Sequence, residues 1–260
     1  MIKKNLGQNF LTDKNKIREI ARALELKNGD TVVEIGPGHG EITRIIVENF
    51  KSQIPNSKLI AIEKDEALAD ALRNSMKTYG GSVEIITGDA LKILPSLIRD
   101  SDHKVVGNIP HYITGFLLRT LGELKIKPRL IVLAIQKEVA ERIAAEPPKM
   151  NLLAATVQFW AEPEIIGTIS KTCFSPQPKV DSAIIKLTPR GVDADTAKYY
   201  SVVKVLFKQP RKTVLNNLSP LAKNRELADE KLKKIGIEAE CRPQNLNITQ
   251  IKRLAEEFND

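Results

Sequence analysis

The sequence predicts an α/β protein with a parallel sheet, followed by a small helical region. Three observations support this prediction. An apolar run breaks into alternate glycines directly before a helical pattern, short apolar runs then alternate with helical patterns, and from residue 191 only helical patterns remain. Alternation of this kind is typical of parallel sheets, because a crossover must return the chain to the same edge. We therefore expect an α/β domain at residues 1–190 and a helical domain at residues 191–260.

The glycine-rich stretch at residues 32–40 reads Val-Val-Glu-Ile-Gly-Pro-Gly-His-Gly. It predicts a buried strand that turns sharply into a helix, where glycine allows unusual backbone angles and close approach of a ligand. A dinucleotide fingerprint would place its third glycine at position 41, but Glu41 stands there and the glycine comes early, at Gly40. Glu34 precedes the first glycine by two residues. A tight turn that binds nothing remains the alternative.

The other elements follow from the spacing of apolar residues. Thr12 or Asp13 can cap a first helix, whose apolar residues recur at helical spacing from Ile17 to Leu24. Apolar runs bounded by turn residues predict strands at 32–35, 59–62, 83–87, 104–106, 129–135 and 183–187. Helical patterns lie at 41–50, 66–76 and from 136, and residues 152–160 predict a helix that leads into a strand. The C-terminal region predicts helices at 199–207, 226–235 and 249–258, and no strand.

Acidic residues follow two of the predicted strands. Glu63 ends the strand after the glycine turn, where a carboxylate can accept hydrogen bonds from ribose hydroxyls. Asp89 follows the next strand and could accept a hydrogen bond from the amino group of an adenine. Because parallel strands end at one edge of the sheet, these residues and the glycine turn together favour a nucleoside-bearing cofactor. Alone, Glu63 would be read as a charge that flanks a helix.

The strand at residues 104–106 runs into Asn108, Ile109, Pro110 and His111. The Asn108 side-chain oxygen and the Ile109 carbonyl can both accept hydrogen bonds from an amino group, which would aim its nitrogen and stabilise a developing positive charge. Proline fixes the turn and removes a competing donor. The alternative is an ordinary turn at the end of a strand.

Two loops can contact nucleic acid. Phe174 opens a proline-spaced loop at residues 174–182 and can either stack on a base that is flipped out of its helix or fill the core. Arg211 and Lys212 form a basic turn, which suits phosphates or is a solvated run of charge.

The composition is ordinary for a water-soluble protein, with 42% hydrophobic and 28% charged residues. We expect a cytoplasmic protein, because no apolar run could span a membrane and no signal pattern opens the chain. Cys173 and Cys241 lie far apart, which favours reduced thiols, and the histidines lack the spacing of metal ligands, so we expect no metal. The net charge of +8 suits a polyanionic partner or serves solubility. Basic residues gather at 1–22 and 198–260.

Several motifs in this order resemble the ribosomal RNA adenine dimethyltransferases, most closely those of the small-subunit (KsgA) type. They lie at residues 7–11, 34–40, 88–90, 107–110, 136–139, 174–182 and 211–213. The resemblance implies a class I, Rossmann-like methyltransferase fold with a seven-stranded sheet, helices on both faces and a helical C-terminal domain. It also implies a monomer that acts on a maturing small ribosomal subunit. Two adjacent adenosines near the 3′ end of its RNA would each receive two methyl groups on N6.

The resemblance assigns roles to particular residues. S-adenosylmethionine would be bound by residues of the N-terminal segment, the glycine turn and the strand ends, namely Gln8, Asn9, Leu11, Gly36, Gly38, Glu63, Asp89, Ala90 and Asn108. The target base would be held by Asn108, Ile109, Pro110, His111 and Phe174. The RNA backbone would contact Lys179, Arg211 and Lys212.

The sequence departs from the family pattern at two positions. His111 stands where the family has tyrosine, with Tyr112 next, and Pro210 precedes Arg211 where the family has a pair of arginines. Imidazole can stack on adenine, but His111 also keeps open a non-catalytic RNA-binding assembly factor. The branch that dimethylates one adenosine of large-subunit RNA is the other alternative.

Overall fold

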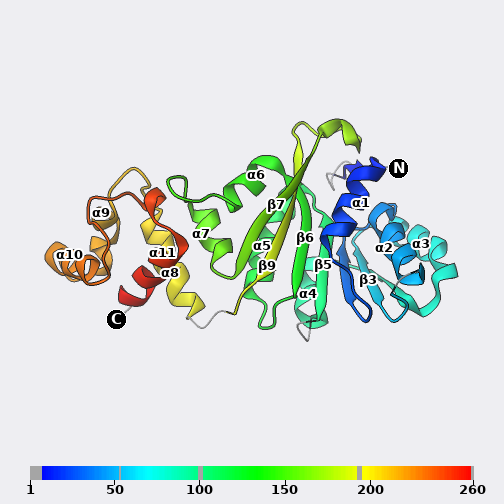
Figure 1. Cartoon of the computed structure of the whole chain (residues 1–260), viewed down its shortest axis with the longest axis horizontal. Helices are drawn as coiled ribbons and strands as arrows, with labels where there is room; N and C mark the ends of the chain where they lie inside the picture. The colour runs from blue at the N-terminus through cyan, green and yellow to red at the C-terminus, as the bar shows by residue number, and fades with distance from the viewer. Residues whose placement is uncertain (1–7, 53, 99–101, 192–194, 259–260) are drawn as a thin grey trace. The chain divides into compact units, whose positions relative to one another are not determined.

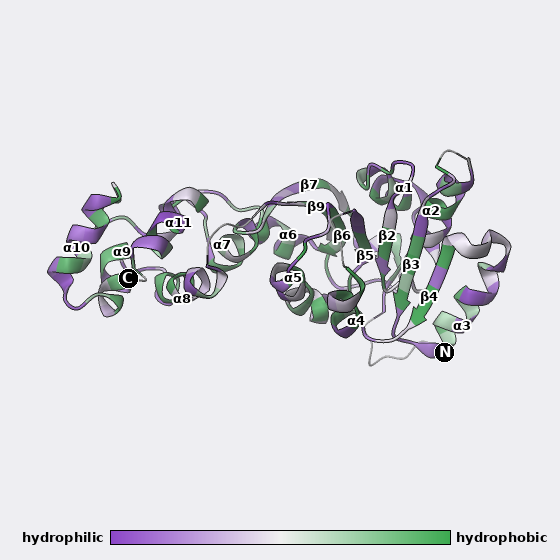
Figure 2. Ribbon diagram, turned by 90° about the horizontal axis from the view of Figure 1, so that it is seen from below, coloured by the Kyte–Doolittle hydropathy of each residue, from purple (hydrophilic) through white to green (hydrophobic). Residues whose placement is uncertain are grey.

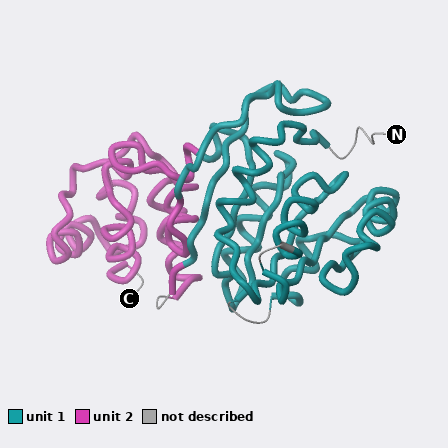
Figure 3. Tube along the Cα trace, turned by 45° about the vertical axis from the view of Figure 1, so that its right-hand side comes forward, with its two compact units in different colours: residues 1–140, 164–189 teal, residues 141–163, 190–260 magenta. Residues whose placement is uncertain are grey.

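The computed structural model describes residues 8–52, 54–98, 102–191 and 195–258 (Figure 1). The chain divides into two compact units, coloured separately in Figure 3. The first unit comprises residues 1–140 and 164–189, and the second comprises residues 141–163 and 190–260. The expected boundary at residue 190 separates these units except for the segment 141–163, which groups with the C-terminal helices.

The first unit is built on a seven-stranded sheet with the order β4-β3-β2-β5-β6-β9-β7. Its strands are β2 (Thr31–Ile35), β3 (Lys58–Glu63), β4 (Val83–Thr87), β5 (His103–Asn108), β6 (Leu130–Gln136), β7 (Ala161–Ile169) and β9 (Ser182–Pro189). Strands β2 to β6 pair in parallel, whereas β9 runs antiparallel to β6. The chain moves outward from β2 to β4 and then crosses to β5 on the other side of β2. Ligands of parallel sheets bind where the order reverses in this way, beyond the carboxyl ends of the strands.

Helices follow the strands of the first unit. They are α1 (Lys14–Ala23), α2 (Glu41–Ser52), α3 (Glu66–Ser75), α4 (Ala90–Leu97), α5 (Thr114–Glu123) and α6 (Lys137–Ile143). Asp13, rather than Thr12, caps α1 by accepting hydrogen bonds from the backbone of residues 15 and 16. Two helices were not predicted: α4, which contains Pro95, and α5, which begins a few residues after the Asn108 turn.

The core of the first unit joins the sheet to α1 and α2. Val32, Leu59 and Val106 are fully buried on the strands, and they belong to one apolar cluster with Ile20 of α1 and Ile46 of α2. Figure 2 shows β3 and β4 as largely hydrophobic strands. Burial of each such side chain stabilises the fold by about 1.5–3 kcal/mol, which holds the carboxyl ends of the strands in fixed positions.

The second unit is helical. It contains α7 (Leu152–Gln158), α8 (Thr196–Leu206), α9 (Val214–Leu218), α10 (Arg225–Lys234) and α11 (Ile248–Glu257). The helices predicted at 199–207, 226–235 and 249–258 are confirmed as α8, α10 and α11, and no strand lies among the described residues 195–258. Helix α9 is too short for apolar periodicity to show it.

The segment 141–163 joins the second unit because α7 packs against α8. The Tyr199 hydroxyl donates a hydrogen bond to the Ala155 carbonyl at 2.8 Å, and the Tyr199 ring stacks on Phe159 with centroids 3.8 Å apart. These partners are far apart in the sequence, so local periodicity does not reveal the contact. Among the described residues, no helix combines the length and the apolar character needed to cross a membrane.

Candidate active site

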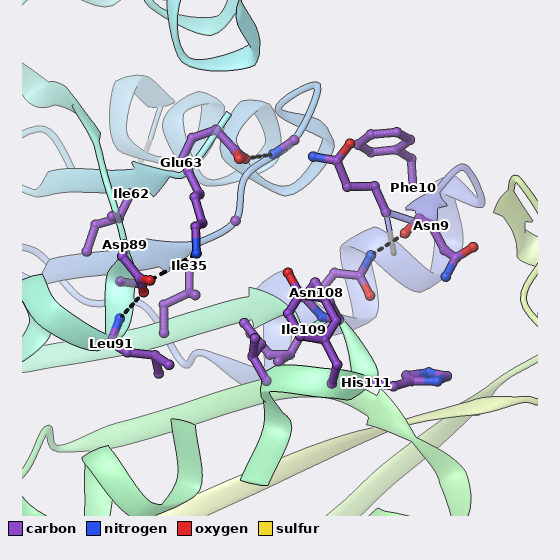
Figure 4. A pocket seen from close by; sticks show the side chains of 18 of the residues that line it. Asn9, Phe10, Ile35, Ile62, Glu63, Asp89, Leu91, Asn108, Ile109 and His111 are labelled. Atoms are coloured by element: carbon purple, nitrogen blue, oxygen red, sulfur yellow. Dashed lines mark hydrogen bonds and ion pairs between the residues drawn. The ribbon is translucent and has the colours of Figure 1, made fainter. Parts of the chain in front are cut away.

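A cavity of about 250 Å³ opens at the carboxyl ends of β2, β3, β4 and β5 (Figure 4). The loops that form it are pinned to neighbouring strands by backbone hydrogen bonds. Gly36 donates to the Ile62 carbonyl at 2.9 Å, Gly88 to the Glu63 carbonyl at 2.8 Å, and Ile109 to the Ala134 carbonyl at 2.9 Å. The sheet therefore fixes the positions from which the side chains enter the cavity.

The three glycines of the turn after β2 have different tasks, although all have a positive φ, at 64°, 60° and 83°. Gly36 and Gly38 line the cavity. A Cβ on Gly36 would meet no atom within 4 Å, whereas a Cβ on Gly38 would lie 2.8 Å from the Phe10 ring. A Cβ on Gly40 would lie 2.5 Å from Leu72 of α3, so the third glycine serves helix packing.

Glu63 ties the end of β3 to the glycine turn. Its carboxylate is buried, with 4% of the residue exposed. Oε2 accepts a hydrogen bond from the Gly38 N–H at 3.0 Å, and Oε1 accepts one from the Asp65 N–H at 2.9 Å. Each carboxylate oxygen has a second acceptor position. Glu63 lines the cavity and retains the capacity to accept a ligand hydroxyl.

Asp89 and Lys64 form an ion pair in the cavity wall, with Lys64 Nζ 3.0 Å from Asp89 Oδ2 (Figure 4). The other oxygen of Asp89 caps α4 by accepting the Leu91 N–H at 3.1 Å. Burial works against ionisation, but the bonds from Lys64 and Leu91 hold the pKa of Asp89 below its ordinary value. Sequence reasoning identified Asp89 and missed Lys64. The position of Lys64 directly after Glu63, at the end of a predicted strand, is the sequence signal that could have indicated it.

The amide of Asn108 is oriented by the N-terminal segment. Its Nδ2 donates a hydrogen bond to the Asn9 carbonyl at 2.9 Å, as Figure 4 shows, and the amide oxygen is the end that can accept. Gly107 makes this position possible, because a Cβ there would lie 2.6 Å from the Ile35 carbonyl oxygen. Asn108, Ile109, Pro110 and His111 all line the cavity.

A small two-stranded sheet brings the N-terminal segment to the cavity. Strand β1 (Phe10–Leu11) pairs antiparallel with β8 (Phe174–Ser175), and this pairing was not predicted. Gln8, Asn9 and Phe174 line the cavity, whereas Leu11 is 2% exposed and its side chain packs in the apolar core. Phe174, which is 6% exposed, belongs to both the cavity wall and the core. Gly7, the first residue of the N-terminal motif, lies outside the described residues, as do Lys3 and Lys4.

Glu34 lies behind the glycine turn rather than in the cavity wall. It is 1% exposed, and Oε2 accepts a hydrogen bond from the Thr43 hydroxyl of α2 at 2.7 Å. Burial raises the pKa of this carboxyl to about 8, so Glu34 is largely protonated at neutral pH. The acidic residue of the glycine motif therefore anchors the first turn of α2.

The mouth of the cavity carries aromatic side chains. His111 and Tyr112 lie in a short 3₁₀ turn (His111–Ile113), and Phe116 follows in the first turn of α5. All three are exposed and line the cavity. Partial burial lowers the pKa of His111 below its ordinary value, which favours the uncharged imidazole.

Of the remaining predicted site residues, one lines the cavity and the others lie on exposed loops. Ala90 lines the cavity at the start of α4. Lys179 is exposed on the loop before β9, and the neighbouring Pro178 and the first residue of β9, Ser182, line the cavity. Arg211 and Lys212 belong to the second unit and are exposed. In the part of the chain that the structure describes, no group of three histidines, cysteines or acidic residues is arranged to hold a metal ion.

The basic turn of the second unit is built around a buried amide. Asn217 is 6% exposed, and its Nδ2 donates hydrogen bonds to the carbonyls of Gln209, Lys212 and Thr213 at 3.0, 3.3 and 3.1 Å. Thr213 in turn caps α9. The turn is thus held in one shape with its cations outward.

Comparison with known proteins matches residues 1–260 to the family described as "Ribosomal RNA adenine dimethylase". The chain belongs to this family. The family match and the fold confirm the resemblance inferred from the motifs. A ribosomal RNA small subunit methyltransferase A of Clostridium botulinum is 36% identical over 261 residues, which cover 97% of this chain and 92% of that relative.

Two solved structures of RNA-modifying or adenosine-modifying transferases share the fold. A dimethyladenosine transferase from Plasmodium falciparum aligns with a TM-score of 0.80 and 25% identity, over 96% of this chain and 97% of that one. The 23S rRNA methyltransferase ErmE aligns with a TM-score of 0.77 and 25% identity, over 97% of this chain and 100% of that one. This likeness and the seven-stranded sheet with C-terminal helices confirm the class I methyltransferase fold that the sequence predicted.

Proposed function

We propose that this protein transfers methyl groups from S-adenosylmethionine to N6 of two adjacent adenosines in the 3′-terminal hairpin loop of small-subunit ribosomal RNA. The observation that carries the proposal is the Asn108 amide, oriented by the Asn9 carbonyl at the wall of a cavity that also holds Glu63 and Asp89. Relatives that are 36% identical over nearly the whole chain are named small-subunit methyltransferases, which favours that subunit over the large one.

The cavity fits S-adenosylmethionine. Gly36 leaves open space beside the glycine turn, where any larger side chain would enter the site. The buried Glu63 carboxylate would accept hydrogen bonds from the ribose hydroxyls, and the Asp89 carboxylate would accept one from the amino group of adenine. Gln8, Asn9, Gly38 and Ala90 would complete this side of the cavity, and Leu11 would support it from the core. When bound, the cofactor supplies an electrophilic methyl group.

The protein's own contribution is positioning. The Asn108 amide oxygen and the Ile109 carbonyl would accept hydrogen bonds from the adenosine amino group, which directs its lone pair and stabilises the positive charge that develops on N6. Pro110 would fix the turn, and Phe174 and His111 would offer aromatic faces to the base. Lys179, Arg211 and Lys212 would contact phosphates. The partner would be a maturing small ribosomal subunit, met by a monomer in the cytoplasm.

Methyl transfer to defined substrates tests this proposal. Radiolabelled S-adenosylmethionine is supplied with unmethylated small-subunit particles and, separately, with large-subunit RNA. We expect transfer to the particles, with dimethylated adenosines found by mass spectrometry. Transfer to large-subunit RNA alone would assign the protein to the other branch. RNA binding without any transfer would identify a non-catalytic assembly factor.

Replacement of Asn108 tests the residue that carries the proposal. We expect Asn108→Ala to lower kcat by about 100-fold or more, because one acceptor for the transition-state charge is lost. Affinity for S-adenosylhomocysteine, measured by calorimetry, should stay within about tenfold, because most ligand contacts remain. Asn56→Ala, at an exposed asparagine outside the cavity, is the matched control. Near-normal turnover by the Asn108 variant would contradict the assigned role.

A further inference from the structure

The mouth of the cavity exposes more aromatic surface than the fold requires. Phe116 is 65% exposed, the largest fraction among the large hydrophobic side chains of the described residues, and Tyr112 is 52% exposed. Both line the cavity. Helix α5 packs through other residues, since Leu117, Leu118 and Leu121 are buried. An aromatic ring left in water beside a binding cavity marks a surface that a ligand covers.

The guanidinium of Arg119 extends this surface along α5. Arg119 lies three residues after Phe116, so the two side chains are neighbours on one face of the helix. Arg119 Nε is 2.8 Å from Glu123 Oε1, but the side chains are 76% and 54% exposed. An ion pair this open to water is weak, and a guanidinium binds phosphate well, so exchange of Glu123 for a phosphate costs little.

We propose that Phe116 and Arg119 form a second nucleotide site, where the base next to the target adenosine stacks on Phe116 and its phosphate pairs with Arg119. This inference rests on the proposed function, in which the two target adenosines are adjacent. When one target base occupies the cavity, the base next to it in the RNA lies at the cavity wall, where Phe116 is the most exposed large hydrophobic side chain. The aromatic and cationic surface at the mouth is where single-stranded RNA is bound through stacking and phosphate contacts.

Fluorescence provides a direct test of the stacking. The chain has one tryptophan, Trp160, which is 1% exposed, so Phe116→Trp adds an exposed reporter over a buried background. The probe is an RNA hairpin with two adjacent loop adenosines, whose binding is followed separately by anisotropy of an end label. We expect the hairpin to quench the emission of the Phe116→Trp variant. Ile126→Trp is the matched control, because Ile126 is 41% exposed and does not line the cavity.

Kinetics with unmethylated small-subunit particles test the same site. Phe116→Ala should raise KM for the particles about tenfold, Phe116→Tyr should restore it, and affinity for S-adenosylhomocysteine should not change. Arg119→Ala should also raise KM. Glu123→Ala removes the same ion pair but keeps the cation, so its KM should stay within about twofold of the wild-type value.

Three results would overturn the inference: hairpin binding without quenching at position 116, a Phe116→Ala variant with wild-type KM, or equal effects of Arg119→Ala and Glu123→Ala. Failure of the proposed function looks different, because the wild-type protein would then methylate no small-subunit particles. The quenching experiment needs no turnover, so it still decides whether a base stacks on this face.

Discussion

The two ends of strand β2 each bury a carboxyl group, and the two groups differ in charge. Asp30, just before the strand, is 5% exposed and Glu34, near its other end, is 1% exposed. Lys104 Nζ lies 2.8 Å from Asp30, which also pairs with Arg129. Although burial works against ionisation, these cations and the Lys27 N–H hold the pKa of Asp30 below its ordinary value. Glu34 has a hydroxyl partner and a raised pKa.

This difference separates a structural end of the sheet from a functional one. At the amino end, Lys104 is 2% exposed and also donates to the carbonyls of Leu24 and Glu25 at 2.7 and 2.6 Å, so its three protons are used. At the carboxyl end, the Lys64–Asp89 pair is partly exposed and borders the cavity. Ion pairs at the first end should govern stability, and those at the second end should govern ligand binding.

The largest expected effect is at the amino end. Lys104→Met should destabilise the protein by about 3–5 kcal/mol, because the buried Asp30 loses its buried cation and the carbonyls of Leu24 and Glu25 lose their donor. Urea unfolding measures the loss, and the folded fraction should keep its affinity for S-adenosylhomocysteine. A change below about 1 kcal/mol would show that this cluster does not stabilise the fold.

The next effect concerns pH and Glu34. The folded pKa of about 8 exceeds the ordinary value of 4.5, so between these values the folded state holds a proton that the unfolded state has released. The free energy of unfolding therefore falls as pH rises through this window, and the penalty is complete above pH 8. Glu34→Gln keeps an acceptor for Thr43 and removes the penalty. From pH 5 to pH 9, the free energy of unfolding of this variant should rise by about 2–4 kcal/mol relative to that of the wild type, as measured by urea unfolding. Equal pH slopes in the two proteins would contradict this account.

The smallest effect on stability should come from Lys64→Met, the same substitution at the other end of the sheet. We expect a much smaller loss of stability than for Lys104→Met, because Lys64 is 59% exposed. Without Lys64 the pKa of Asp89 should rise, so binding of S-adenosylhomocysteine should be lost on acidification at a higher pH than in wild type. Calorimetry from neutral to acidic pH measures this shift. If both proteins lost binding of S-adenosylhomocysteine at the same acidic pH, Asp89 would not contribute to the binding site.

The sequence predicted those parts of the molecule that depend on local pattern. Apolar runs located the parallel strands, and the rule that such strands end at one edge predicted that Glu63 and Asp89 lie near the glycine turn, as they do in the cavity wall. Phe174 packs in the core, as one of its two interpretations predicted, and it also lines the cavity, where stacking on a base stays a prediction. The cofactor and RNA contacts of these residues stay predictions.

The features that sequence reasoning missed depend on contacts between distant segments. Strands β1 and β8 have two residues each, too few for any periodicity. The Lys64–Asp89 pair requires the geometry of adjacent loops, and the placement of α7 with the C-terminal helices requires the contact with Tyr199. Phe116 carries no motif signal, and its meaning comes from its exposure at the cavity mouth.

The pairing of Phe10 with Ser175 and of Leu11 with Phe174 has a consequence for changes in chain length. Side chains of a strand alternate between its faces, so one residue inserted or deleted between Asn9 and Leu11 would exchange the face of every residue beyond it. The Asn9 carbonyl would then no longer meet the Asn108 amide. Terminal segments usually accept such changes freely. Here the spacing of residues 9–11 is fixed by strand register, as it is for residues in the core of the enzyme.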